Sequence, residues 1–305
     1  MSLAKEYAAV KAHGGVIDLA SRVKLSFTGN DRLRYLNGQV TAKLTASNGV
    51  QPACVTTAKG KLCADVFIGT WPGVTIVDAD AAVAATLLPR LEKYIVADDV
   101  VIEDITLQAA LIHCIGIPAE ALKEVTHLTA CPANRLGVPG LDLFSPWRDE
   151  LAAHWQALTA RFPIISEELA ELLRIEAGLP RWGYELDENT LPAEAGLDRT
   201  HVDFHKGCYI GQEVISRIKS VGHVNRSLRG FISQNGEPIL SGARISSVQA
   251  PSETLGTLTS AAFSHGLNRS IALGYLKRNA PEAGLCAVSN DGRQVSIALH
   301  ALPFV

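Results

Sequence analysis

The sequence predicts an α+β protein with more than one domain, and three stretches of the chain support this prediction. Residues 50–145 alternate strands and helices in the strand-helix-strand order that is typical of a ferredoxin-like module. Residues 146–222 mix helix and loop. In residues 223–305, short strands predicted at 228–233, 243–248, 256–263, 270–276 and 295–302 alternate with Gly, Asn and Ser turns, a spacing that predicts a small β-barrel or sandwich.

The composition indicates a packed globular protein whose net charge gives no electrostatic attraction to duplex nucleic acid or anionic lipid. The chain has 305 residues, of which 47% are apolar and 19% are charged, and its formal net charge is -3. We therefore expect no direct nucleic-acid partner and no membrane partner. The first residues do not pair a basic segment with an apolar one, so a cytoplasmic location is expected. Six widely spaced cysteines form no C-x-x-C pair, which predicts free thiols and no metal site.

The elements before residue 146 are set by alternating apolar residues and by turn residues. Strands are predicted at 16–19 and 23–28, followed by a helix that Asn30 caps and Gly38 ends. Further strands are predicted at 50–56, 62–69, 74–77, 100–105, 109–115 and 141–144, with helices at 81–94 and after Pro118.

The clearest helix follows Ser166 and ends near Gly178. Ser166 is a good N-cap, and Gly178 followed by Pro180 is a stop signal. Leu169 and the leucines three and four residues later form an apolar stripe, and Glu176 is the next member of that stripe. An unpaired carboxylate there would cost several kcal/mol, so it needs a partner. The partner is either structural, such as an arginine, or a buried ligand with two adjacent N–H donors.

A second unusual feature is Cys208, in a loop between a strand predicted at 202–204 and a helix predicted from residue 210. Lys206 and the N-terminus of that helix both favour the thiolate, so Cys208 is a candidate reactive thiol. The alternative is a small packed residue. His201, Asp203 and His205 would share one face of the strand, but this spacing is not distinctive of a metal site.

The segment around Cys208 is also locally basic. Residues 199–229 hold six Lys or Arg against one Asp and one Glu, a local charge of +4. This charge could attract a small polyanion, or it could belong to a solvated helix face. The sequence has no G-x-G-x-x-G after a strand, no P-loop, no G-x-S-x-G and no H-E-x-x-H motif, which removes the main support for nucleotide-binding and zinc-hydrolase functions.

The segment KGCYIGQE, residues 206–213, resembles the signature of the YgfZ family, folate-binding relatives of the glycine-cleavage T-protein that assist iron-sulfur cluster assembly. The segments LRIEAG (173–178), GYELDE (183–188) and LPAEAGL (191–197) resemble the central block of the wider superfamily. The resemblance implies a T-protein-like three-domain ring that binds tetrahydrofolate in a central channel. Its parts would be a discontinuous first domain (1–49 and 146–222), a ferredoxin-like second domain (50–145) and a C-terminal β-barrel (223–305).

The resemblance also implies roles for particular residues. Glu176 matches the glutamate that holds the pterin in the family, and Cys208 is the functional thiol of the YgfZ side. The same resemblance predicts two further groups: Arg174, Tyr209 and Gln212 at the folate, and Lys206 and Asp65 beside Cys208 in the catalytic group.

One departure from the T-protein pattern affects the expected activity. T-proteins carry paired acids on the second strand of the hairpin, whereas this chain has Ala64 and Asp65 there. We therefore expect a tetrahydrofolate-binding accessory factor for assembly or repair of iron-sulfur enzymes, including tRNA-modifying ones, with iron-sulfur client or assembly proteins as partners. The alternatives are an aminomethyltransferase that transfers a one-carbon unit to tetrahydrofolate, and a folate-binding module without chemistry.

Overall fold

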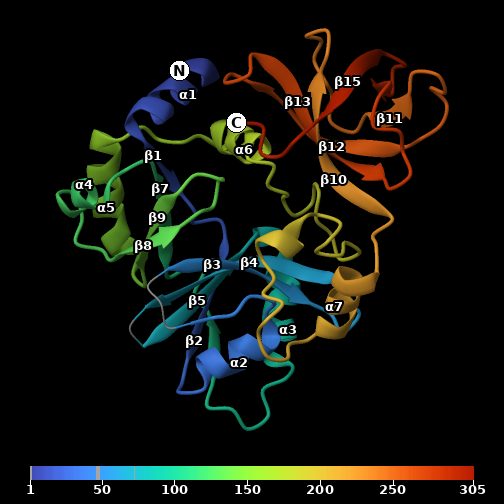
Figure 1. Cartoon of the computed structure of the whole chain (residues 1–305). Coiled ribbons are helices and arrows are strands. Elements are labelled where there is room, and N and C mark those ends of the chain that lie inside the picture. The colour runs from blue at the N-terminus through green and yellow to red at the C-terminus, as the bar shows by residue number, and fades with distance from the viewer. Residues whose placement is uncertain (1, 46–48, 72) are drawn as a thin grey trace.

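Three β-structures organise the chain in the computed structural model, which describes residues 2–45, 49–71 and 73–305. They are a five-stranded sheet, a four-stranded sheet and a closed barrel, and Figure 1 shows them as three groups of strands with helices between and around them. None of the helices within the described residues is long and apolar enough to cross a bilayer.

The five-stranded sheet has the order β3-β4-β5-β2-β6, with antiparallel neighbours. Its strands are β2 (Val23–Thr28), β3 (Val50–Thr56), β4 (Leu62–Trp71), β5 (Val74–Ala79) and β6 (Val101–Asp104). One face packs on α2 (Arg32–Gln39), the 3-10 turn η1 (Ala81–Val83) and α3 (Ala84–Glu92). Ala64, Val66 and Ile68 of β4 point into this core, as alternation along a strand requires.

The four-stranded sheet has the order β1-β7-β9-β8 and is also antiparallel. Its elements are β1 (Gly15–Asp18), β7 (Ala110–Ile115), α4 (Ala119–Lys123), β8 (Ala130–Ala133), β9 (Gly140–Ser145) and α5 (Arg148–Arg161). The run β7-α4-β8-β9-α5, with β1 beside β7, has the ferredoxin-like arrangement. β8 was not predicted.

The strands predicted within residues 50–145 do not share one sheet. β3 to β6 belong to the five-stranded sheet with β2, whereas β7 to β9 form the other sheet with β1. The sequence pattern shows where strands lie but not which strands pair, since pairing across a long connection leaves no local signal. The domain limits at 49/50 and 145/146 stay predictions, and residues 46–48 beside the first limit lie outside the described part.

The C-terminal residues form a closed barrel of order β10-β13-β12-β11-β14-β15, which confirms the predicted C-terminal β-barrel. Its strands are β10 (Arg226–Ser233), β11 (Arg244–Ser247), β12 (Gly256–Ser264), β13 (Arg269–Lys277), β14 (Leu285–Val288) and β15 (Gln294–His300). Inward residues such as Phe231, Ile245 and Leu258 fill its interior. β14 was not predicted.

Helix α6 (Glu167–Glu176) lies where the barrel meets the N-terminal helix α1 (Leu3–His13) (Figure 1). The Ser166 hydroxyl accepts the N–H of Leu169 at 3.2 Å, so the predicted cap is confirmed. Gly178 has φ +72°, a backbone conformation that favours glycine, and its position ends the helix as expected. The helix α7 (Gln212–Val221) and a 3-10 turn, η2 (Leu197–Arg199), complete the fold, and α1 was not predicted.

The strand predicted at 202–204 is wrong, because residues 201–211 form turns and loop in the structure. The carboxylate of Asp203 accepts the backbone N–H of His205 at 2.8 Å. Such a local bond stabilises a turn in competition with extended backbone. His201, Asp203 and His205 therefore do not share a strand face.

A buried ion network joins the two sheets. Arg135, between β8 and β9, donates from Nη1 to Asp78 of β5 at 2.9 Å and from Nε to Asp142 of β9 at 2.8 Å. His113 of β7 lies 2.8 Å from Asp142 through Nδ1, and Arg22 adds a second cation to Asp78 at 2.5 Å. The sheets are therefore connected by paired charges as well as by apolar packing.

Candidate functional site

The loop 206–212 is fixed at one end of the five-stranded sheet by Lys206. The Lys206 ammonium donates to the carbonyl oxygens of Asn37, Val40 and Ala42 at 2.9, 2.8 and 2.5 Å. These carbonyls lie at the C-terminal end of α2, where unpaired acceptors and the helix dipole favour a cation. Burial lowers the pKa of Lys206 to about 8. All three ammonium donors are engaged, so Lys206 anchors this loop, and its catalytic role stays a prediction.

Residues 210–212 are held as tightly against the β3–β4 hairpin. The N–H of Ile210 donates to the Gly38 carbonyl at 3.2 Å, and the Thr56 hydroxyl donates to the Ile210 carbonyl at 2.6 Å. Gly211 has φ +91°, and a Cβ there would lie 2.6 Å from the Thr56 hydroxyl oxygen. Only glycine fits this position. Gln212 begins α7, and its half-buried side chain has no hydrogen-bond partner among the described residues.

Cys208 is the exposed cysteine of the chain and stands on this fixed loop. The other five are buried or half-buried, and none of the six is in a disulfide, which confirms the predicted free thiols. The Cys208 thiol has no hydrogen-bond partner among the described residues. Because its side chain is exposed, Cys208 is not a small packed residue. The arrangement presents an accessible nucleophile on a rigid backbone.

Tyr209 carries a buried hydroxyl without a hydrogen-bond partner in the described part of the chain. The residue is 7% exposed, and burial, with smaller contributions from Cys54 and Asp203, raises the pKa of Tyr209 to about 12. Buried polar atoms without partners are rare and need an explanation. An O–H donor held in this state is a candidate ligand contact.

Asp65 lies on β4 directly opposite Cys54 of β3 and also lacks a hydrogen-bond partner among the described side chains. Burial raises the pKa of the Asp65 carboxyl, and the positive charge of Arg22 opposes the shift. A carboxyl that is half-buried and unpaired can act as a general acid or base. Ala64, the other position of the T-protein acid pair, points into the apolar core on the opposite face, where a second acid would be costly.

Glu176 lies far along the chain from this loop and contacts different elements. Its carboxylate is 1% exposed and accepts hydrogen bonds from the Ser264 hydroxyl of β12 at 2.6 Å and from the Tyr7 hydroxyl of α1 at 3.1 Å. Burial, reinforced by the charge of Glu176, raises the pKa of Tyr7 to about 12. The carboxylate points inward as predicted and has no guanidinium partner among the described residues.

Arg174, two residues before Glu176, forms hydrogen bonds with several parts of the fold. Its Nε and one Nη bond to Glu171, its other Nη bonds to Glu185 at 2.8 Å and to the Leu179 carbonyl at 3.1 Å, and Ser260 of β12 accepts at 2.5 Å. These bonds engage all five guanidinium N–H donors. Arg174 joins α6 to the barrel, and a role at a folate stays a prediction.

The predicted site residues therefore form two groups. Five of them lie on the β3–β4 hairpin or on the loop that contacts it, and Cys54, which the sequence did not single out, interacts electrostatically with two of these, Asp65 and Tyr209. The five are Asp65, Lys206, Cys208, Tyr209 and Gln212. Arg174 and Glu176 form the second group at the barrel, and Figure 1 shows α6 beside the barrel and α7 beside the five-stranded sheet.

The basic stretch 199–229 presents less free charge than its composition suggests. Lys206 is buried and bonded to three carbonyl oxygens. Arg226 pairs with Glu194 at 3.3 Å, and Arg229 pairs with Glu282 at 3.6 Å. Arg217 and Lys219 lie on α7 at the surface or near it. Three of the six Lys and Arg side chains in this stretch therefore have their charge balanced by acceptors within the fold.

Two cavities of the described structure have none of the seven predicted site residues in their walls, although Glu185, which bonds to Arg174, lines the smaller one. The larger, about 480 Å³, lies between the two sheets and includes Trp71, Phe144 and His127 in its wall. The smaller, about 290 Å³, lies beside the barrel and includes Arg226 and Tyr275. Neither is lined by Asp65, Cys208 or Glu176, so the cavities do not by themselves identify a folate site.

Comparison with known proteins identifies the fold. Residues 226–305 match the family model of the glycine cleavage T-protein C-terminal barrel domain. The solved structure of the glycine cleavage system aminomethyltransferase T from Bartonella henselae superposes with a TM-score of 0.85 at 19% identity, covering 100% of this chain and 90% of that one.

Similarity in sequence extends over most of the chain. An aminomethyltransferase of Streptomyces avermitilis is 29% identical over 98% of this chain and 88% of its own length. An iron-sulfur cluster assembly factor IBA57 homolog, mitochondrial, of Phaeosphaeria nodorum is 25% identical over 70% of this chain and 54% of its own length.

The molecule therefore has a T-protein-like fold, in which mixed α/β structure is followed by a closed six-stranded barrel. Its C-terminal residues carry the T-protein barrel domain, and aminomethyltransferases are among its relatives in sequence.

Proposed function

We propose that this chain is a cytoplasmic, tetrahydrofolate-binding accessory protein that supports assembly or repair of iron-sulfur enzymes, including those that modify tRNA, and that Cys208 is its functional thiol. The observation that carries the proposal is the exposed Cys208 side chain on a loop that Lys206, Thr56 and Gly211 hold rigid. A thiolate is a ligand for iron and a nucleophile. The similarity to the IBA57 homolog supports the same function.

The partner proteins follow from the coordination chemistry of a cluster. Iron-sulfur clusters are held by several thiolates. The remaining cysteines of the chain are buried or half-buried, so Cys208 supplies one accessible sulfur ligand. Any contact with a cluster therefore needs a client or an assembly protein to supply the other ligands.

Folate binding is proposed at Glu176. Its two carboxylate oxygens each accept one hydroxyl, whereas a carboxylate offers about four acceptor positions. The planar N–H pair of a pterin matches the remaining positions. A pterin that reaches Glu176 must displace the Tyr7 or Ser264 side chain, because the carboxylate is closed to solvent without a ligand.

Replacement of Cys208 by serine tests the proposed function. In cells that lack the wild-type protein, we expect Cys208→Ser to lose most of the support for iron-sulfur enzyme activity, because the thiol is removed while an exposed position tolerates serine. Cys63→Ser is the matched control, since Cys63 is half-buried and lies outside the loop. Equal enzyme activity with Cys208→Ser and wild type would show that the thiol has no function.

Aminomethyltransferase activity is the second candidate function, and two observations favour it. Relatives of that name cover nearly the whole chain, and Asp65 is an unpaired carboxyl of raised pKa on the hairpin. Formation of methylene-tetrahydrofolate with the glycine-cleavage partner proteins distinguishes the candidates. Turnover that Asp65→Asn abolishes and Cys208→Ala leaves intact would establish the transferase, and its absence in wild type would support the accessory protein.

A further inference from the structure

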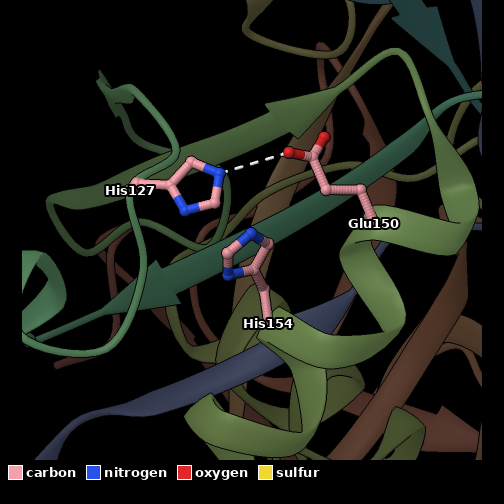
Figure 2. A group of neighbouring side chains, drawn as sticks. All are labelled: His127, Glu150 and His154. Atoms are coloured by element: carbon pink, nitrogen blue, oxygen red, sulfur yellow. Dashed lines mark hydrogen bonds and ion pairs between the residues drawn. The ribbon is translucent and has the colours of Figure 1, made fainter.

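Three potential metal ligands lie close together in the ferredoxin-like part of the molecule. None of them belongs to the β3–β4 hairpin or to the loop 206–212. Glu150 and His154 lie four residues apart on α5, so they share one face of that helix, and His127 comes from the turn between α4 and β8. One nitrogen or oxygen of each lies within 4.8 Å of those of the other two. Figure 2 shows the three side chains converging.

The separations suit a metal ion of small radius. Nε2 of His127 lies 3.2 Å from Oε1 of Glu150. Ligands at about 2.0–2.1 Å from a tetrahedral Zn²⁺ lie roughly 3.3 Å from each other, so this pair already has the required spacing. The two imidazole rings are 4.6 Å apart between centroids and meet edge to face.

The surroundings orient the carboxylate and leave one imidazole without a bond. The Ser145 hydroxyl donates to Oε2 of Glu150 at 2.8 Å, which leaves Oε1 directed at His127. Such an outer partner is typical of carboxylate ligands. His154 is 9% exposed and has no hydrogen-bond partner among the described residues, although Figure 2 shows its ring directed at the other two side chains.

We propose that His127, Glu150 and His154 form a binding site for a divalent transition metal ion, for which Zn²⁺ is the best match. Two imidazoles and a carboxylate are a known Zn²⁺ ligand set, with water in the fourth position. Imidazole ligands disfavour Mg²⁺ and Ca²⁺, which prefer oxygen. His127 also lines the larger cavity, so the bound ion would lie beside that space.

Metal titration of the purified full-length chain tests this site. After treatment with a chelator, wild type is expected to bind one Zn²⁺ per chain in competition with a chromophoric chelator, and to give a Co²⁺ absorption spectrum of nitrogen and oxygen ligation. His127→Ala and Glu150→Gln are each expected to weaken binding by about 100-fold or more, because loss of an outer partner alone costs about 10–100-fold. Ser145→Ala should then weaken it by about 10-fold.

Matched controls separate this site from other metal ligands of the chain. His223→Ala removes an exposed histidine outside the cluster and should leave the affinity unchanged. Cys208→Ser should also leave it unchanged, and the Co²⁺ spectrum should lack thiolate charge-transfer bands. His127 and Glu150 are exposed, so their variants are expected to fold like wild type. Failure of wild type to bind Zn²⁺, or binding that Cys208→Ser abolishes and His127→Ala preserves, would overturn the proposal.

Discussion

Two buried carboxylates near the barrel are stabilised in different ways. Glu185 receives Arg174 at 2.8 Å together with the hydroxyls of Thr259 and Ser260, each at 2.6 Å, so its charge is neutralised within the fold. Glu176 receives only the hydroxyls of Tyr7 and Ser264 from described side chains. Hydroxyl donors offset part of the desolvation cost of a carboxylate but supply no counter-charge. Glu176 is therefore the better prepared of the two to accept further N–H donors.

Glu176→Gln tests this difference. The amide keeps the shape and one acceptor oxygen but loses the negative charge, so tetrahydrofolate affinity should fall by about 1–3 kcal/mol, the scale of a hydrogen bond to a charged group. Isothermal titration with tetrahydrofolate measures the change, and urea unfolding measures the stability of the same variant. Tyr7→Phe is the control, because it removes one hydroxyl and keeps the carboxylate. A Glu176→Gln variant that loses stability but binds folate like wild type would assign a purely structural role to Glu176.

At the scale of elements, Lys206 joins the loop 206–212 to the end of α2. A helix leaves its last carbonyl groups unpaired, and one ammonium group here satisfies carbonyls of three residues. The same contact fixes the backbone on which Cys208 stands. The position of the thiol therefore depends on a side chain two residues away.

Lys206→Met should destabilise the protein by about 2–4 kcal/mol, because the methionine chain refills the space but leaves buried carbonyl groups without donors. Urea unfolding of the variant and of Lys59→Met, an exposed lysine on the adjacent hairpin turn, gives the comparison. The rate at which Cys208 is alkylated reports on the loop 206–212. It should differ from the wild-type rate in Lys206→Met and equal it in Lys59→Met. Equal free energies of unfolding in the two variants would show that the hydrogen bonds from Lys206 to the three carbonyl groups do not stabilise the protein.

Local signals predicted the elements whose patterns are complete in themselves. The helix after Ser166 has a cap, an apolar stripe and a glycine stop, and each of these features is present in α6. The N-terminal helix α1 was missed, because its polar side chains face solvent and one residue, Val10, is buried. The strand at 202–204 was predicted from alternation alone, whereas the Asp203 side chain makes a turn. β14 has four consecutive buried residues and no alternation to reveal it.

The candidate sites show the same limit. The inward direction of Glu176 followed from helical periodicity, but its partners Tyr7 and Ser264 come from remote segments. Likewise, the four-residue spacing of Glu150 and His154 is visible in the sequence, whereas His127 joins them through the fold. Spacing within one helix reports shared faces, and contacts between elements need the tertiary structure.

At the scale of the whole molecule, the two sheets are joined by the Asp78–Arg135–Asp142 network. Burial alone would raise the pKa of both aspartates, but the charge of Arg135 outweighs it and holds both below their usual range. Because the folded-state pKa is depressed, the stability that these carboxylates contribute is present above their unfolded pKa of about 3.9 and is lost as the pH falls through the folded value. The interface between the sheets is therefore expected to weaken in acid.

Arg135→Met gives this network a sharp test. Removing the cation leaves Asp78 and Asp142 buried with less compensation, which should lower the free energy of unfolding by about 3–5 kcal/mol at pH 7. In the variant the aspartate pKa values rise, so protonation relieves the buried charges and the deficit relative to wild type should shrink at pH 5. Arg161→Met breaks an exposed pair with Glu124 and should change stability by less than about 1 kcal/mol at either pH. A deficit for Arg135→Met that is the same at both pH values would mean that the loss comes from packing rather than from uncompensated charge, since the packing of methionine does not depend on carboxylate protonation.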